Sequence, residues 1–257
     1  MGKSKVINVG LLGCGVVGTG VVELFKENKN PNVTLKTIVV KDPKKQRKVK
    51  FQNIITDADK VLEDPEIDIV VELIGGYEPA KGYIINAIKN KKHVVTANKA
   101  VISEYGDEIF KLAEKNKVNV GFEAAVAGGI PIINPLLDQL SLGKISSIAG
   151  ILNGTTNFIL TRMAEGMKYE EALKIAQEKG FAESNPSFDV EGKDAAQKIA
   201  ILASLAFGRW IKPKDVFCEG ITEIKPVDIE YARELGYAIK LLAIAQRARD
   251  GEIDVRV

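Results

Sequence analysis

The sequence predicts an α/β fold in two domains, and two observations carry this prediction. Over residues 6–122, apolar segments of strand length alternate with segments of helical periodicity, which is typical of a parallel sheet with helices on both faces. Glycines and a proline at residues 128–131 then mark a change of element, beyond which a helix and a strand lead into a run of helices. We therefore expect one domain over residues 1–130 and a second, α+β domain over residues 131–257.

The elements of each domain follow from periodicity. In the first domain we expect strands at residues 6–12, 34–40, 68–74, 93–99 and 118–122, and helices after residue 18 and at residues 57–62, 79–90 and 103–115, the last capped by Ser103. In the second we expect a strand at residues 145–152 and helices at residues 132–140, 156–165, 169–179, 193–207 and 229–249. Residues 252–257 alternate polar and apolar like the first half of a strand, so we expect the chain to be a fragment of a longer protein.

Composition and charge exclude several classes of protein. No apolar run reaches membrane-spanning length and the N-terminus lacks a secretion signal, so we expect a cytoplasmic protein with no membrane partner. The net charge of +2, without interleaved basic and aromatic residues, argues against a nucleic-acid partner. Two cysteines without CxxC spacing and a single histidine, His93, argue against a transition-metal enzyme.

A glycine motif follows the first expected strand and opens the first expected helix. Gly13 allows a tight turn, Gly15 lets the backbone approach a pyrophosphate, and Gly18 permits close packing of helix against strand. Glycines also serve ordinary turns, but the strand–turn–helix context favours a Rossmann-type dinucleotide-binding domain. The residues expected to contact the cofactor here are Gly13, Gly15, Val16, Val17 and Gly18.

Further cofactor positions are expected where later strands end. Gly75 and Gly76 close one strand, and Asn98 and Lys99 close another, at the edge of the sheet where a dinucleotide lies. Lys41 follows the second strand, where a basic residue accommodates the 2′-phosphate of NADP and a carboxylate favours NAD. Asp42 comes next, and a run of solvated basic residues is the alternative interpretation, so we expect NADP without excluding NAD.

The second domain offers polar residues suited to proton transfer. Asp194 and Lys198 share one face of an alanine-rich helix that an apolar stripe anchors in the protein, although such a pair is usually solvated and merely stabilises its helix. Asn153, Gly154 and Thr155 follow a strand, where small polar residues either bind a substrate or cap the next helix.

Six segments in order resemble the motifs of homoserine dehydrogenases over about residues 7–245. They are Gly10-Leu-Leu-Gly-Cys-Gly-Val-Val-Gly, Val71-Glu-Leu-Ile-Gly-Gly, Val94-Val-Thr-Ala-Asn-Lys, Glu123-Ala-Ala-Val-Ala-Gly-Gly-Ile-Pro, Gly150-Ile-Leu-Asn-Gly-Thr-Thr-Asn-Phe-Ile-Leu and residues 183–198. The resemblance implies reversible NAD(P)-dependent oxidation of L-homoserine to L-aspartate 4-semialdehyde, on the route to threonine and methionine.

The resemblance also implies roles for particular residues. Lys198 and Lys99 would flank the reacting oxygen, Asp194 would orient or bind at the same centre, and Glu183 would hold the substrate ammonium group, while Asn153, Gly154 and Thr155 would complete the substrate site. By similarity, backbone carbonyls would bind a monovalent cation such as sodium, at Glu123, Val126, Gly128 and Ile130. A plain strand-to-helix turn is the alternative at these four positions.

The chain departs from the family in two respects. Phe181 and Ser184 stand where relatives often have tyrosine and proline, so a hydroxyl role at position 181 is lost. Relatives continue past residue 257 with strands that form a homodimer interface, which leaves dimerisation of this chain open. Two competing functions are a thioester-forming semialdehyde dehydrogenase, for which Cys14 and Cys218 are poorly placed, and a non-catalytic dinucleotide-binding sensor of the same fold.

Overall fold

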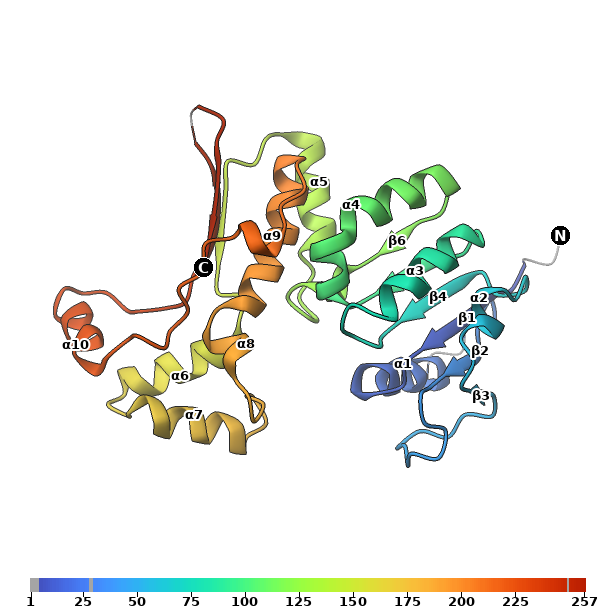
Figure 1. Cartoon of the computed structure of the whole chain (residues 1–257), viewed down its shortest axis with the longest axis horizontal. Coiled ribbons are helices and arrows are strands. Elements are labelled where there is room, and N and C mark those ends of the chain that lie inside the picture. Colours follow the sequence, from blue (N-terminus) through green and yellow to red (C-terminus); the bar gives the residue numbers. More distant parts are fainter. Residues whose placement is uncertain (1–4, 28–29, 249) are drawn as a thin grey trace. The chain divides into compact units, whose positions relative to one another are not determined.

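The computed structural model describes residues 5–27, 30–248 and 250–257, in two compact units. The first unit is Met1–Pro131 and the second is Ile132–Val257, a division one residue beyond the boundary expected from the sequence (Figure 1). None of the helices in these ranges is long and apolar enough to cross a membrane.

The first unit is built on a parallel sheet with strand order β3-β2-β1-β4-β5-β6. Its strands are β1 Ile7–Leu12, β2 Val33–Val39, β3 Ile54–Ile55, β4 Ile69–Glu72, β5 His93–Thr96 and β6 Val120–Gly121. The chain starts in the middle of the sheet, extends to one edge through β2 and β3, and returns to build the other edge from β4 onward. This is the doubly wound order of the expected fold class, in which ligands bind outside the carboxyl ends of the strands where the order reverses, here β1 and β4.

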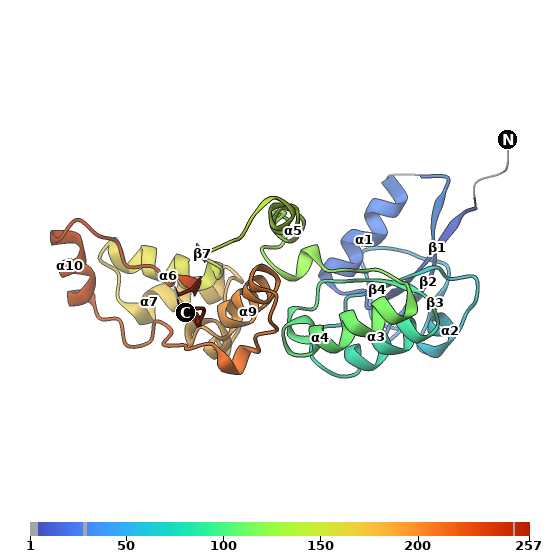
Figure 2. The same ribbon diagram turned by 90° about the horizontal axis from the view of Figure 1, so that it is seen from above.

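Helices cover both faces of this sheet, with α1 on one face and α2, α3 and α4 on the other (Figure 2). Their bounds are α1 Val16–Glu27, α2 Asp59–Leu62, α3 Ala80–Lys89 and α4 Lys99–Asn116, and a short 3-10 helix, η1, spans Glu123–Ala125. Successive side chains of β1 point to opposite faces of the sheet. Leu11 packs with Val22 of α1, whereas Leu12 packs with Ile84 of α3 and Val101 of α4. Both faces of the sheet are therefore buried.

One expectation for this unit was wrong, and one short strand was not expected. Helix α4 begins at Lys99 rather than Ser103, because the Asn98 side chain caps it by accepting a hydrogen bond from the Val101 amide at 3.3 Å. Ser103 is buried inside the helix and donates to the Ala100 carbonyl. The two-residue strand β3 was not expected, since so short a segment carries no periodicity.

The second unit combines helices with an antiparallel sheet of order β7-β8-β9. Its elements are α5 Ile133–Leu142, β7 Ser147–Gly150, α6 Gly154–Ala164, α7 Tyr169–Glu178, α8 Ser187–Val190, α9 Lys193–Phe207, the 3-10 helix η2 Pro213–Asp215, α10 Pro226–Glu234, β8 Ala243–Arg247 and β9 Ile253–Arg256. Helix α9 is buried along most of its length, so a polar side chain on it is held in a fixed environment.

The helix expected over residues 229–249 was wrong. Helix α10 ends at Glu234, and Gly236 then adopts a left-handed conformation with φ of +80°. Residues 243–247 form strand β8, in which Ala243 and Ala245 point into the core and the intervening residues are less buried. The alanine content of this segment suits a helix, and pairing with β7 and β9 overrides that propensity.

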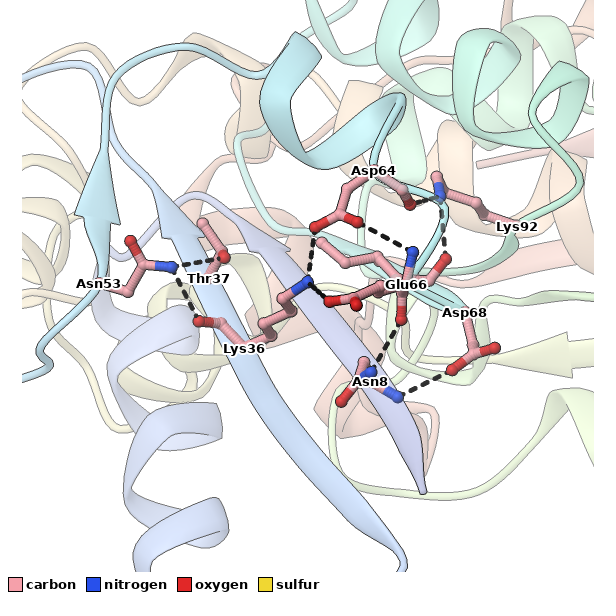
Figure 3. Close-up of polar contacts among 9 residues, drawn as sticks. Asn8, Lys36, Thr37, Asn53, Asp64, Glu66, Asp68 and Lys92 are labelled. Carbon is pink, nitrogen blue, oxygen red and sulfur yellow. Dashed lines mark hydrogen bonds and ion pairs between the residues drawn. The ribbon is translucent and has the colours of Figure 1, made fainter. Parts of the chain in front are cut away.

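A polar cluster fixes the amino-terminal edge of the parallel sheet (Figure 3). Lys92 is only 3% exposed, and its ammonium group donates to the carbonyls of Asp64 and of Ile67, the latter at 2.9 Å. Burial lowers the pKa of Lys92, and the nearby carboxylates of Asp64 and Asp68 oppose that shift. Lys36 forms ion pairs with Asp64 at 2.8 Å and Glu66 at 2.5 Å, so the segment between α2 and β4 is held from two sides.

We expect Lys92→Met to lower the free energy of unfolding by about 1–3 kcal/mol, because the carbonyls of Asp64 and Ile67 would each lose a buried donor, and the Asp64 carbonyl would keep only its bond from the Ile67 amide. Lys91→Met is the matched control, since Lys91 is exposed and its ammonium group donates to the Asn116 side chain rather than to buried carbonyls. Urea unfolding of both variants measures the difference. Equal stability of the two variants would show that Lys92 does not hold this edge.

Candidate functional site

Two glycines of the turn after β1 are required by the packing of the protein itself. Gly13 has a φ of +96°, and a Cβ there would lie 2.7 Å from the Leu73 carbonyl oxygen. A Cβ on Gly18 would lie 2.3 Å from the Gly13 carbonyl oxygen. Any side chain at either position would displace backbone, so the fold explains both glycines without a ligand.

Gly15 is different, because a Cβ there would meet no atom of the protein within 4 Å. Val16 and Val17 beside it are 93% and 58% exposed, at the first turn of α1. Space left open at a helix N-terminus suits a phosphate group, which the helix dipole and amide groups attract. The geometry of this turn therefore fits a dinucleotide, and among the three glycines of the motif Gly15 is the one whose small size the packing of the chain itself does not require.

A buried network shapes the same edge of the sheet. Glu72 is fully buried, and its carboxylate accepts hydrogen bonds from the Ile74 amide and the Thr96 hydroxyl, each at 2.7 Å. Asn98 donates through Nδ2 to the Gly76 carbonyl at 2.8 Å while it caps α4. The strand-end glycines are thus tied to the start of α4, and Glu72 is a residue that sequence analysis missed.

The expected cofactor residues near these contacts lie as follows. Gly75 and Gly76 have φ of +82° and +72°, and added Cβ atoms there would meet nothing within 4 Å. Asn98 is buried with its side chain engaged in structural contacts, and Lys99 is the first residue of α4 and half-buried. Their contacts with a cofactor stay predictions.

The loop after β2 presents Lys41 to solvent, directly after the buried Val40. The Asp42 carboxylate accepts a hydrogen bond from the Lys44 amide at 2.8 Å and is thus engaged in a local turn. The half-buried Arg47 donates to the carbonyls of Asp42 at 2.7 Å and Lys45 at 2.9 Å, and it organises this loop. Both side chains are exposed, and the Asp42 carboxylate is engaged by its own loop.

The expected cation-binding residues form a tight turn that begins in η1. Ala127 and Gly128 both adopt left-handed conformations, with φ of 58° and 59°, and Ile130 is 70% exposed. The described residues contain no cluster of three or more His, Cys, Asp or Glu side chains that would hold a metal ion. A cation at Glu123, Val126, Gly128 and Ile130 would therefore depend on backbone carbonyls, and its presence stays a prediction.

In the second unit, Asp194 and Lys198 form a shielded ion pair rather than a solvated surface pair. Lys198 Nζ lies 2.6 Å from Asp194 Oδ2, and their side chains are 19% and 7% exposed, respectively. The same ammonium group donates to the Leu152 carbonyl at 2.7 Å. These two contacts fix the position of the Lys198 head group at the end of β7.

Asn153 connects this pair to a second carboxylate. Its Oδ1 caps α6 by accepting from the Thr156 amide at 2.8 Å, and its Nδ2 donates to Asp189 Oδ1 at 2.7 Å and Asp194 Oδ2 at 2.9 Å. The Asn153 side chain therefore caps α6, which is one of the two roles that the sequence left open, and it also orients two acids. Thr155 uses its hydroxyl to bind the Phe181 carbonyl at 2.6 Å.

These residues border one pocket of about 620 Å³. It is lined by Asn153, Gly154, Thr155, Asn157, Phe158, Thr161, Phe181, Asp189, Asp194 and Lys198. The structure thus brings together five residues expected from the sequence and adds Asp189, which sequence analysis missed. The sequence did hold a signal for Asp189, because it precedes Asp194 by five residues. Gly192 lies between these two acids, and its φ of +80° turns the chain from α8 into α9.

Glu183 does not line this pocket. Its side chain is exposed, and its backbone carbonyl accepts from the Gln177 side chain at 3.1 Å. Lys99 belongs to the first unit, so its expected place beside Lys198 stays a prediction.

Comparison with known proteins places both units in one family. The family model described as the NAD-binding domain of homoserine dehydrogenase matches residues 13–123, and that described as homoserine dehydrogenase matches residues 131–257. The chain belongs to the homoserine dehydrogenase family. This confirms the resemblance and the α/β fold class expected from the sequence.

Individual relatives agree with this assignment. A homoserine dehydrogenase from Synechocystis sp. is 52% identical over 93% of this chain and 57% of its own length. A solved homoserine dehydrogenase from Thiobacillus denitrificans superposes with a TM-score of 0.90 and 44% identity, over 98% of this chain and 61% of that one. A hyperthermophilic archaeal homoserine dehydrogenase, solved in complex with NADPH, has a TM-score of 0.77 and 26% identity, over 97% of this chain and 80% of that one. The chain thus spans about three fifths of the first two relatives.

The glycine turn yields a paired prediction. Gly15→Ala is expected to leave thermal stability unchanged while it weakens dinucleotide binding about tenfold or more, because the added methyl group would enter only the ligand's space. Gly18→Ala is expected to destabilise the fold itself. Melting temperatures and NADPH titration by fluorescence separate the two effects. Unchanged NADPH affinity in Gly15→Ala would remove this turn from the cofactor site.

Proposed function

We propose that this chain carries the NAD(P)-dependent interconversion of L-homoserine and L-aspartate 4-semialdehyde, on the route to threonine and methionine. The observation that carries the proposal is the shielded Asp194–Lys198 pair at the wall of a pocket, in a chain of this family. The first unit would bind the dinucleotide and the second the amino acid. When bound, the nicotinamide ring would accept hydride from homoserine or return it to the aldehyde.

Lys198 would move the proton at the substrate oxygen. Oxidation of the alcohol releases its hydroxyl proton, so a base must stand within hydrogen-bond reach, and in the reverse direction the same group protonates the developing alkoxide. Asp194 and the Leu152 carbonyl occupy two donors of the ammonium group and leave the third for substrate. Lys99 is the proposed second cation, whose charge would favour the neutral form of Lys198 against the opposing effect of Asp194.

The acids near this centre would receive the substrate ammonium group. Asp189 lines the pocket, and both it and Asp194 accept a hydrogen bond from the Asn153 amide. This position supports a direct contact between Asp189 and the substrate ammonium group. Glu183 lies outside that lining and is proposed as a second ammonium partner on the basis of family similarity. Asn153, Gly154 and Thr155 complete the substrate site at the start of α6.

The remaining components of the proposal rest on the fold and the family. NADP is the proposed cofactor, held by the glycine turn, by Lys41 and by the residues at the ends of β4 and β5, and the NADPH complex of the archaeal relative supports it. We also propose a monovalent cation, such as sodium, at the turn after η1. Homodimerisation and a cytoplasmic location stay predictions.

Neither competing function finds support in the structure. A thioester mechanism needs a cysteine at the substrate pocket, but Cys218 is half-buried, donates to the Glu191 carbonyl, and has its thiol pKa raised by burial. Neither Cys218 nor Cys14 lines that pocket. A non-catalytic sensor would not need Lys99, Asp194 and Lys198, all of which the chain contains.

The decisive assay follows formation of reduced cofactor by absorbance, with L-homoserine and with NADP or NAD in turn. Homoserine-dependent reduction of either cofactor is expected. Absence of turnover with both, in a chain that binds dinucleotide, would contradict the proposal.

We expect Lys198→Ala to lower kcat by about two to four orders of magnitude, the usual contribution of general acid–base catalysis, with little change in cofactor affinity. Lys193→Ala is the matched control on the same helix, because the exposed Lys193 pairs only with Glu191 among the described residues. Steady-state kinetics of both variants provide the comparison. Turnover of Lys198→Ala within a few-fold of wild type would exclude Lys198 as the proton carrier.

Cofactor preference is expected to depend on Lys41. A charge-assisted hydrogen bond to the 2′-phosphate contributes about 1.5–3 kcal/mol, so Lys41→Ala should reduce the preference for NADP over NAD about tenfold or more. Lys48→Ala, in the same exposed basic segment, is the control. Dissociation constants of both cofactors decide the matter, and an unaltered NADP/NAD ratio in Lys41→Ala would mark Lys41 as a solvated loop residue.

A further inference from the structure

Lys240 stands behind the wall of the substrate pocket and holds two of its lining residues. It precedes β8, is half-buried, and donates from Nζ to Asn157 Oδ1 at 3.0 Å and to Thr161 Oγ1 at 2.9 Å. Asn157 and Thr161 lie one turn apart on α6 and both line the pocket. Lys240 itself borders a separate, smaller cavity of about 180 Å³. None of these contacts is explained by the proton transfer assigned to Lys198.

The contact with Lys240 fixes which way the Asn157 amide faces. An ammonium group only donates hydrogen bonds, so the carbonyl oxygen of Asn157 must point to Lys240 and the NH₂ group must point away. Thr161 helps to hold Lys240 in place, because its hydroxyl accepts from Lys240 at 2.9 Å while it donates to the main-chain carbonyl of Asn157 at 2.7 Å. Within the described part of the chain, Asn157 Nδ2 has no hydrogen-bond acceptor. An oriented donor is therefore left at the pocket wall.

Charge is distributed unevenly along α6. Asp189 and Asp194 gather around Asn153 at its start, with Lys198 paired to Asp194. Asn157 follows one turn later, about 6 Å along the axis, with the positive charge of Lys240 behind it. Lys240 forms no ion pair with any carboxylate of the described residues. The acids at the start of α6 match the ammonium group of an α-amino acid. The Asn157 amide, with the positive charge of Lys240 behind it, matches the carboxylate.

We propose that Asn157 Nδ2 binds the carboxylate of the amino-acid substrate, and that Lys240 is the positioning residue that orients this amide and places positive charge behind it. The assignment rests on the proposed function and deepens it, since it specifies how the pocket distinguishes an α-amino acid from a simple amino alcohol. Asn157 is thus a specificity residue, and Lys240 acts through it.

Two variants test the pair with L-homoserine as substrate. Lys240→Met removes the charge and frees the amide, and it is expected to raise KM about tenfold or more with kcat little changed. Asn157→Asp keeps an acceptor for Lys240 but replaces the donor by a carboxylate, and it is expected to raise KM about 10- to 100-fold. Lys240→Arg should restore part of the loss in Lys240→Met. Lys174→Met, an exposed lysine on α7, is the matched control.

Binding of L-homoserine and L-homoserinamide, measured by calorimetry, separates carboxylate recognition from a change of pocket shape. The amide keeps the hydroxyl and ammonium groups but has no carboxylate, so the variants should lose affinity for L-homoserine and little for the amide. Unchanged KM in both variants, or equal losses for the two ligands, would overturn the assignment while wild-type turnover leaves the proposed function intact. A wild-type chain that binds neither compound would instead refute the proposed function and this assignment with it.

Discussion

The organisation of the second unit depends on one buried amide side chain. Asn153 is 4% exposed, and the hydrogen bonds of its side chain join the start of α6 to Asp189 of α8 and to Asp194 of α9. Two carboxylates in one shielded place repel each other unless donors or cations compensate them. The amide supplies one donor to each, and Lys198 supplies the charge for Asp194. Removal of this side chain would leave buried charge without its donor, a costly change in free energy.

The first unit has the same arrangement at the edge of the sheet where the cofactor is proposed to bind. Asn98, like Asn153, caps a helix through Oδ1 and ties a distant segment through Nδ2, in this case the Gly76 carbonyl. In both units an asparagine at the junction of a strand and a helix thus fixes the backbone that forms the proposed site. The rigid caps keep these sites defined without a ligand, and space for the ligand is left by small residues such as Gly15.

The sequence predicted most of what periodicity and motif spacing encode. The five longer or flanking strands β1, β2, β4, β5 and β6, the glycine turn and the pairing of Asp194 with Lys198 follow from local patterns, since each depends on residues close in the chain. Strand β8 was missed because its alanines satisfy a helical pattern and only the partner strands β7 and β9 decide otherwise. Asp189, Glu72 and Lys240 were missed for a related reason. Each acquires its role through a contact with a residue more than 20 positions away in the sequence, and local patterns do not reveal such contacts.

In the proposed function, Asp194 and Lys198 act as one unit on the substrate. A double-mutant cycle on kcat/KM for L-homoserine, with Asp194→Asn, Lys198→Ala and the double variant, tests it most directly. If the two groups act together, removal of either one already abolishes their joint contribution to kcat/KM. The double variant is therefore predicted to be no slower than the slower single variant. Losses that multiply in the double variant would show two independent contributions, and would contradict the account.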